Sequence, residues 1–131
     1  SPRADPESPY SGVITKFVER VRNGRPPRIE GDGLQTRDFI HARDVAAMAA
    51  ALVDAEGVSG KVFNCGSGRS TSVLELAKVT IAASGRHFEP EFTAPRKGDI
   101  RHSLADVSLA KEVLGFSARI PLSEGMAELL S

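Results

Sequence analysis

The sequence of 131 residues is poor in cysteine and aromatic residues and carries no net charge. It holds one cysteine, one tyrosine and no tryptophan, and 17 basic side chains balance 17 acidic ones. A single cysteine excludes a disulfide within the chain and is typical of a reducing compartment, so we expect a cytoplasmic protein. The balanced charge makes nucleic acid an unexpected partner. Because no apolar run is long enough to span a bilayer, we expect no membrane partner either.

Metal and hydrolase chemistry also lack the patterns they need. The three histidines, His41, His87 and His102, show no metal-ligand spacing with Cys65 or with one another. No glycine–serine elbow accompanies them, so a serine hydrolase has no supporting motif. The length suits one domain, which at this size buries about two-thirds of its unfolded surface. We therefore expect one soluble domain without a metal site.

A turn, a strand and a helix start follow one another within residues 31–46. Gly31-Asp32-Gly33 is typical of a tight turn, because glycine tolerates backbone angles that other residues avoid. Residues 36–40 alternate in the manner of a short strand. Asp44 is placed to cap a helix that begins at Val45. The rest of the chain is arranged around this segment.

The pair Arg37-Asp38 lies inside the expected strand. Two interpretations are open. In the first, both side chains lie on a solvated face or pair with neighbouring charges. In the second, Arg37 projects into a cleft and holds an anion, because long cations are seldom placed in an apolar strand for packing alone.

The remaining pattern predicts an α/β domain with several helices and short strands. Apolar residues at helical spacing, with glycine or proline stops, indicate the helices, and Ser72 and Asp106 are placed to cap two of them. We expect helices at residues 11–23, 45–55, 73–84, 107–114 and 122–131. We expect strands at residues 28–30, 36–40, 61–65 and 91–94.

The turn Gly66-Ser67-Gly68 separates an expected strand from an expected helix. Strand, glycine turn and helix is the layout of a dinucleotide-binding motif. However, Thr71 stands where the third glycine of that motif is needed for close packing of helix on strand. Ser72 already caps the helix. We interpret the segment as a structural turn and not as a cofactor site.

A second charged segment, residues 95–106, places Arg96, Lys97 and Arg101 around one carboxylate, Asp99. Guanidinium groups match phosphate oxygens in a forked geometry, and a carboxylate can accept hydrogen bonds from ribose hydroxyls. Composition alone favours a simpler interpretation, a surface salt-bridge cluster. Pairs of that kind contribute only about 0–1 kcal/mol each.

Two motifs resemble those of a known family. Gly-Asp-Gly-x-Gln-x-Arg-Asp-Phe-Ile-His at residues 31–41 and Arg-x-Gly-Asp at residues 96–99 are similar to the C-terminal half of extended short-chain dehydrogenase/reductase enzymes that act on nucleotide sugars. The likeness covers nearly the whole chain. Arg101-His102-Ser103 is more similar to the epimerases than to the dehydratases or decarboxylases. The resemblance implies an α/β fragment of a Rossmann-type enzyme, the substrate-binding portion of an NAD-dependent nucleotide-sugar 4-epimerase of the UDP-glucose/UDP-galactose type.

The resemblance also implies which residues contact a UDP-sugar. Arg37 and Arg96 match arginines on the diphosphate, Asp99 matches a ribose contact, and Arg101 carries less weight. Glu30 departs from the aromatic residue that many relatives have there, so base stacking is not implied. The base would lie against residues of the first helix and first strand, namely Val13, Ile14, Phe17, Arg28, Ile29 and Glu30.

The catalytic and cofactor motifs of that family are absent from the sequence. Its enzymes use a tyrosine with a lysine four residues later, but Tyr10 is the only tyrosine here and Ile14 stands at the lysine position. No complete Gly-x-x-Gly-x-x-Gly turn exists. We expect residues 1–131 to be a truncated sugar-nucleotide-binding C-terminal domain whose N-terminal NAD-binding half is absent. The parent would use NAD in carbohydrate metabolism, whereas this chain would bind no NAD and catalyse nothing.

The resemblance leads to one expectation about solution behaviour and leaves two alternative functions open. Because the cofactor half would be missing, apolar faces should be left bare and favour self-association. A C-terminal part of a nucleotide-sugar dehydratase or decarboxylase is the nearest alternative to an epimerase. A binding domain without any catalytic role is the alternative from another class.

Overall fold

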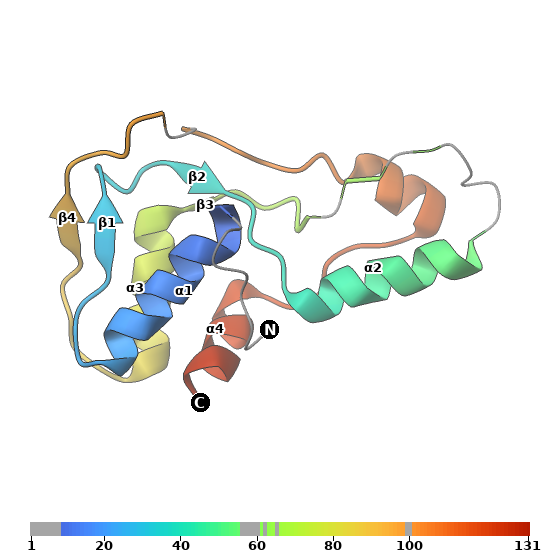
Figure 1. Ribbon diagram of the computed structural model, residues 1–131. Helices are drawn as coiled ribbons and strands as arrows, with labels where there is room; N and C mark the ends of the chain where they lie inside the picture. The colour runs from blue at the N-terminus through green and yellow to red at the C-terminus, as the bar shows by residue number, and fades with distance from the viewer. Residues whose placement is uncertain (1–8, 56–60, 62, 65, 99–100) are drawn as a thin grey trace.

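The computed structural model describes residues 9–55, 61, 63–64, 66–98 and 101–131. The elements follow in the order α1 (Pro9–Arg22), β1 (Arg28–Glu30), β2 (Thr36–Arg37), α2 (Ala42–Asp54), β3 (Thr71–Ser72), α3 (Val73–Ser84), β4 (Glu91–Thr93), the π-helical turn η1 (Ala110–Leu114) and α4 (Leu122–Leu130). Figure 1 shows α1, α3 and α4 grouped beside β1 and β4, whereas α2 extends away from them. The mixture of helices and short strands agrees with the predicted α/β class.

Two small sheets join distant parts of the chain. β1 pairs with β4 in parallel, with Ile29 opposite Phe92. β2 pairs with β3 in the antiparallel sense, and a single bridge joins Thr36 to His102. The segments that follow β1 and β4 therefore run side by side, and the segment around His102 is tied to β2. This arrangement creates the candidate site.

The core lies between α1, α3 and α4. Phe17 of α1, Leu76 of α3, Met126 of α4 and Ile29 of β1 are each at most 1% exposed. Burial of such a side chain contributes about 1.5–3 kcal/mol. Because Ile29 is buried in this core, the core holds β1 in place, together with the residues that follow it.

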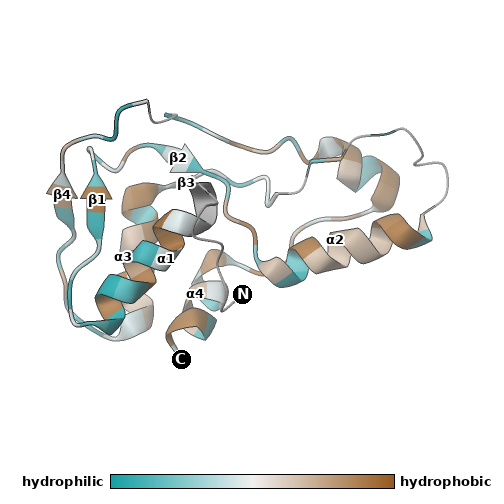
Figure 2. Cartoon of the chain, in the orientation of Figure 1, coloured by the Kyte–Doolittle hydropathy of each residue, from teal (hydrophilic) through white to brown (hydrophobic). Residues whose placement is uncertain are grey.

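Helix α2 has a different environment from the other helices. Its buried residues are Asp44 and Met48, while Val53 is 84% exposed. Figure 2 shows that α2 is largely apolar in composition. Its N-terminal end is joined to the rest by polar contacts, because the Asp44 carboxylate accepts hydrogen bonds from the backbone N–H groups of Arg119 (3.1 Å) and Ile120 (3.0 Å).

The prediction that Asp44 caps α2 is wrong. The helix begins at Ala42, and His41 is its N-cap, with Nδ1 accepting a hydrogen bond from the Arg43 N–H at 2.9 Å. Asp44 lies in the first turn, and its carboxylate faces the backbone near Ile120 instead. A histidine nitrogen can replace the usual oxygen of a cap because it also offers a lone pair.

Two predicted strands are shorter than expected or not observed. The strand predicted at residues 36–40 is confirmed for Thr36 and Arg37 alone, since its partner β3 has two residues. The strand predicted at residues 61–65 is not observed at 61, 63 and 64, and residues 62 and 65 lie outside the described residues. A strand needs a neighbour to complete its hydrogen bonds, and no described residue pairs with this segment.

Of the two other predicted caps, one is confirmed. Ser72 Oγ accepts a hydrogen bond from the Glu75 N–H at 3.0 Å and begins α3. Asp106 Oδ1 accepts a hydrogen bond from the Ser108 N–H at 3.1 Å, but the N-cap of η1 is Leu109, which makes no side-chain cap hydrogen bond, so the prediction that Asp106 caps this helix is wrong. The helical segment is π-helical from Ala110 to Leu114 and ends before Gly115, as predicted.

Candidate functional site

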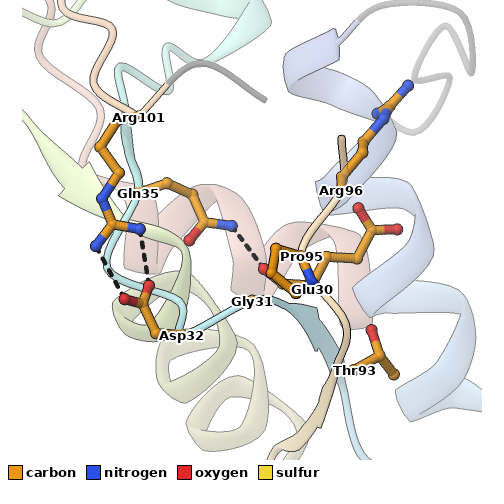
Figure 3. Close-up of a pocket in the computed structure, with 8 residues that line it drawn as sticks. All are labelled: Glu30, Gly31, Asp32, Gln35, Thr93, Pro95, Arg96 and Arg101. Carbon is orange, nitrogen blue, oxygen red and sulfur yellow. Dashed lines mark hydrogen bonds and ion pairs between the residues drawn. The ribbon is translucent and has the colours of Figure 1, made fainter. Parts of the chain in front are cut away.

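A cavity of about 490 Å³ lies beside the C-terminal ends of β1 and β4. Figure 3 shows the side chains and backbone that surround it. They come from the turn after β1, the segment after β4 and the segment that bridges to β2. The lining residues are Glu30, Gly31, Asp32, Gln35, Thr93, Pro95, Arg96 and Arg101.

The turn after β1 is built tightly. The Gly31 N–H donates to the Thr93 carbonyl at 2.9 Å, which extends the pairing of β1 with β4. Gly33 has a φ of 77°, and a Cβ there would lie 3.0 Å from the Cβ of Leu74, so glycine is favoured on two grounds. Gln35 is 7% exposed, and its Nε2 donates to the Glu30 carbonyl at 3.0 Å. The backbone beside the cavity is therefore held by several hydrogen bonds.

A bidentate ion pair joins Arg101 and Asp32, which both line the cavity. Nη1 and Nη2 of Arg101 each donate to one carboxylate oxygen of Asp32 at 2.9 Å. The Leu34 N–H donates to the same carboxylate at 2.8 Å. The hydrogen bonds from Arg101, with a smaller effect of the Leu34 N–H, lower the pKa of Asp32 to about 2. Asp32 is therefore ionised throughout the physiological pH range.

The backbone of Arg101 is fixed separately from its side chain. The Thr36 N–H donates to the Arg101 carbonyl at 2.8 Å, and the Ser103 N–H donates to the Thr36 carbonyl at 3.1 Å. Thr36 Oγ1 and His102 Nδ1 also lie within hydrogen-bond distance, 2.7 Å apart. The bridge between β2 and this segment thus brings Arg101 to the cavity.

Arg96 is the second cation of the cavity and differs from Arg101. Its side chain is exposed, and among the residues that the structure describes it has no ion-pair partner. Figure 3 shows its guanidinium group directed away from the Arg101–Asp32 pair. Both arginines line the cavity, but their guanidinium groups do not face each other, and their shared role stays a prediction.

The structure does not bring Arg37 into this cavity. Its side chain is 8% exposed, its Nη1 donates to the Thr36 carbonyl at 2.7 Å, and it is not among the described residues that line the cavity. Arg37 follows Thr36 on β2, and successive strand residues point to opposite faces. The predicted convergence of Arg37 and Arg96 is not observed, and a diphosphate contact by Arg37 stays a prediction. Asp99 lies outside the described residues.

The residues predicted to lie near a base are mostly core residues. Phe17 and Ile29 are at most 1% exposed, while Val13 and Ile14 are partly buried and pack against the core. The apolar stripe of α1 therefore faces α3 and α4, and Phe17 and Ile29 are core residues. Arg28 Nε lies 3.6 Å from Glu91 Oε2, and of this predicted group Glu30 alone is a described lining residue.

The turn at residues 66–68 has a structural partner. Asp38 Oδ1 accepts hydrogen bonds from the Ser67 N–H (2.8 Å) and Oγ–H (2.5 Å), and Oδ2 accepts one from the Gly68 N–H (2.9 Å). The N–H groups that a dinucleotide motif would direct at a phosphate are thus directed at a carboxylate. These contacts support the interpretation of a structural turn, and Asp38 pairs with neighbouring groups, as the first of its two interpretations expects.

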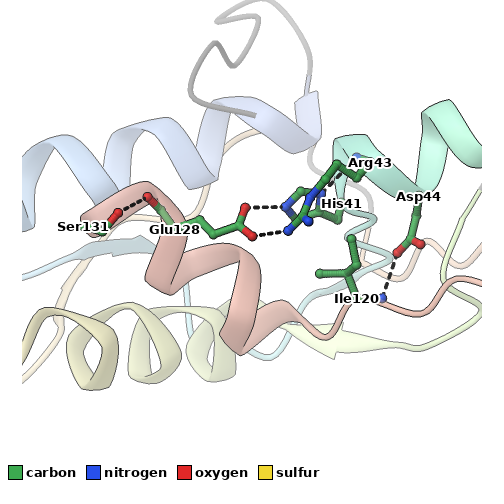
Figure 4. Close-up of polar contacts among 6 residues, drawn as sticks. All are labelled: His41, Arg43, Asp44, Ile120, Glu128 and Ser131. Atoms are coloured by element: carbon green, nitrogen blue, oxygen red, sulfur yellow. Dashed lines mark hydrogen bonds and ion pairs between the residues drawn. The ribbon is translucent and has the colours of Figure 1, made fainter.

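A second polar cluster joins α2 to α4, away from the cavity. Figure 4 shows Glu128 facing His41 and Arg43. His41 Nε2 donates to Glu128 Oε2 at 2.9 Å, and Arg43 Nη2 forms an ion pair with Glu128 Oε1. Because the His41 hydrogen bond stabilises the ionised carboxylate, it lowers the pKa of Glu128. This cluster was not predicted, since its members are far apart in sequence.

The described residues contain neither a metal-ligand cluster nor a helix suited to a membrane. No group of three or more histidine, cysteine, aspartate or glutamate side chains among them is placed to hold a metal ion. No helix in the described part of the chain is both long and apolar enough to cross a membrane. Five of the described lining residues are not identified as site residues from the sequence, namely Gly31, Asp32, Gln35, Thr93 and Pro95, although the first three lie inside the motif at residues 31–41.

Comparisons with known proteins identify the family. The NAD dependent epimerase/dehydratase family matches residues 1–66. A UDP-glucose 4-epimerase of Mycolicibacterium smegmatis is 42% identical over 97% of this chain and 40% of its own length. A dTDP-glucose 4,6-dehydratase of Streptomyces griseus is 31% identical over 96% of this chain and 37% of its own length. The chain thus spans about 40% of the length of such relatives.

The fold agrees with this assignment. The crystal structure of UDP-glucose 4-epimerase from Thermotoga maritima with UDP-glucose superposes with a TM-score of 0.87 at 36% identity, covering 99% of this chain and 41% of that one. The predicted Rossmann-type class of the short-chain dehydrogenase/reductase enzymes is thereby confirmed. The chain belongs to the NAD-dependent epimerase/dehydratase family.

Proposed function

We propose that the cavity binds the nucleotide part of a nucleotide sugar, and that residues 1–131 form the sugar-nucleotide-binding domain of a 4-epimerase of the UDP-glucose/UDP-galactose type. One observation carries the proposal. Arg96 and Arg101 come from different segments and line the same cavity of about 490 Å³. That volume lies within the range of ligand pockets, about 300–1,000 Å³.

The chemistry of the cavity suits a diphosphate joined to a nucleoside. A diphosphate needs forked cationic donors, which the two guanidinium groups supply. The nucleoside needs acceptors and donors for its hydroxyls and base edge, which Glu30 and Thr93 offer at the cavity wall. Asp99 remains a proposed ribose contact, and Arg37 a proposed diphosphate contact from outside the cavity.

We propose that NAD is used by the intact protein and is not held by this chain. The described glycine turn does not fit a pyrophosphate, because its Ser67 and Gly68 N–H groups already bind Asp38. The sequence also lacks the tyrosine–lysine pair of the family. The partner that completes the enzyme would then be an N-terminal NAD-binding half, and the protein would act in the cytoplasm.

The proposal is tested by titrating this chain with UDP in a calorimeter. We expect weak binding that Arg96→Ala reduces more than tenfold, since a charge-assisted contact contributes about 1.5–3 kcal/mol. Arg25→Ala is the matched control, because Arg25 is an exposed arginine outside the cavity. Equal affinities for both variants would overturn the assignment. The same chain should show no NAD binding and no interconversion of UDP-glucose and UDP-galactose.

A dehydratase is the second candidate, favoured by the 31% identity to a dTDP-glucose 4,6-dehydratase. The two candidates differ in the nucleotide that they hold. Tighter binding of UDP than of dTDP supports the proposed UDP-sugar epimerase, and the opposite order overturns the choice of UDP, because dTDP is the nucleotide of the similar dehydratase and of a similar dTDP-L-rhamnose 4-epimerase. If the cavity bound neither nucleotide, both candidates would be wrong, and the alternative of a non-catalytic binding domain would remain.

A further inference from the structure

The two cations of the cavity are not equally available to an anion. Nη1 and Nη2 of Arg101 each donate a hydrogen bond to one oxygen of the Asp32 carboxylate at 2.9 Å. Arg96 has no ion-pair partner among the described residues. A carboxylate that binds a guanidinium group in this forked way uses the same donors that a phosphate would use.

Asp32 is not needed to bring Arg101 to the cavity. The Arg101 carbonyl accepts a hydrogen bond from the Thr36 N–H at 2.8 Å, and the bridge of Thr36 with His102 fixes the neighbouring backbone. Both partners of the ion pair are 53% exposed at their side chains, so the pair can open into solvent without burying an uncompensated charge. Opening the Asp32–Arg101 ion pair would therefore change the charge that the cavity presents to a ligand, while the backbone around the cavity would stay in place.

The charges around the cavity are balanced. Glu30 and Asp32 supply two carboxylates against the two guanidinium groups of Arg96 and Arg101 among the described lining residues. A ligand with several negative charges gains little from a balanced site unless one carboxylate gives way. Asp32 is the carboxylate in direct contact with a cation that the ligand needs.

We propose that Asp32 is an internal competitor of the anionic ligand, occupying the forked donors of Arg101 until a diphosphate displaces it. This rests on the proposed function for the identity of the natural ligand, but the competition itself applies to any diphosphate. Asp32 then lowers the affinity for anions and keeps the empty cavity from holding cellular anions of low charge. Neutral ligands are not subject to this competition.

The test compares Asp32→Asn with the unchanged chain, using inorganic pyrophosphate, UDP and uridine as probes in calorimetric titrations. Asparagine keeps an oxygen for the Leu34 N–H, so the turn is preserved while the charge is removed. We expect pyrophosphate and UDP to bind more tightly by roughly tenfold, because a nearby like charge is lost. Uridine affinity should not change. Asp54→Asn, an exposed acid at the end of α2, is the control and should leave all three affinities unchanged.

Unchanged or weaker pyrophosphate binding in Asp32→Asn would overturn the proposal. If Asp32 served only to position Arg101, its replacement would weaken pyrophosphate binding. Equal changes for uridine and pyrophosphate would also overturn it, because they indicate a structural effect. If Asp32→Asn does not fold, Asp32→Ser keeps an oxygen for Leu34 and must show the same gain. Failure of the proposed function is distinguishable: UDP would then bind no more tightly than pyrophosphate, while the pyrophosphate comparison still decides the role of Asp32.

Discussion

The Asp38 carboxylate accepts two hydrogen bonds from Ser67, which lies 29 positions later in the chain. One oxygen of the Asp38 carboxylate accepts both the backbone N–H of Ser67 at 2.8 Å and its hydroxyl at 2.5 Å. Residue 66 next to Ser67 must be glycine for this packing. A Cβ at Gly66 would lie 2.8 Å from the other Asp38 oxygen and 2.5 Å from the Cβ of Ala105. The carboxylate therefore holds three segments together immediately after β2.

Asp38→Ala should destabilise the fold by about 1–3 kcal/mol, because the two partly buried donors of Ser67 and the exposed N–H of Gly68 lose their acceptor. The free energy of unfolding in urea measures this. Asp54→Ala is the matched control, since an exposed aspartate away from such contacts changes stability by no more than about 0.5 kcal/mol. Similar values for the two variants would show that the Asp38 contacts contribute nothing.

The acidic residues show what sequence spacing can and cannot predict. Asp106 is predicted as a cap, but it binds the N–H and the hydroxyl of Ser108 in a local turn ahead of η1, whose N-cap is Leu109. Asp44 was also predicted as a cap, but it binds the backbone of Ile120, 76 positions later. Both aspartates precede or begin a helix in the sequence. Their different roles depend on which distant backbone the tertiary fold brings near.

The lowered pKa of Glu128 leads us to expect that the stability of the fold depends on pH. The Glu128 pKa is lowered by the His41 hydrogen bond, so the contact stabilises the fold above the ordinary glutamate pKa of 4.5 and is lost as the pH falls below that value. We expect the melting temperature to fall less between about pH 6 and pH 3.5 in Glu128→Gln than in the unchanged chain. Glu124→Gln, on the same helix, is the control and should behave as the unchanged chain does. Parallel curves for Glu128→Gln and the unchanged chain would contradict this account.

The exposed face of α2 predicts self-association of the chain. Val45, Ala49 and Val53 are spaced by four residues and lie on one face, with Val45 43% and Val53 84% exposed. Exposed apolar surface of this kind favours association, so we expect the average mass in analytical ultracentrifugation to rise with concentration.

The matched variants are Val53→Lys, which should weaken this association, and Leu104→Lys, which should not. Leu104 is an exposed apolar residue outside α2, at 56%. A chain that stays monomeric at high concentration would show that the α2 face does not associate.

The candidate site was predictable in part. Arg96, Arg101 and Glu30 were predicted from motifs and do line one cavity, because those motifs lie at the ends of strands that pair with each other or bridge to one another. The sequence predicts Asp32 as a turn residue, and the fold shows that it also binds Arg101, 69 positions later. Arg37 was predicted in the same cleft, but strand alternation, which depends on the register of β2, places it elsewhere.

The central claim is that UDP occupies the cavity between β1, β4 and the bridge at His102. The most direct measurement is an NMR titration of the isotope-labelled chain with UDP, followed by the backbone amide signals. The account predicts progressive shifts at Gly31, Gln35, Thr93 and Arg101, which line the cavity, with little change at Ala49 of α2. Shifts confined to α2 or to the turn at residues 66–68, or no shifts at saturating UDP, would contradict it.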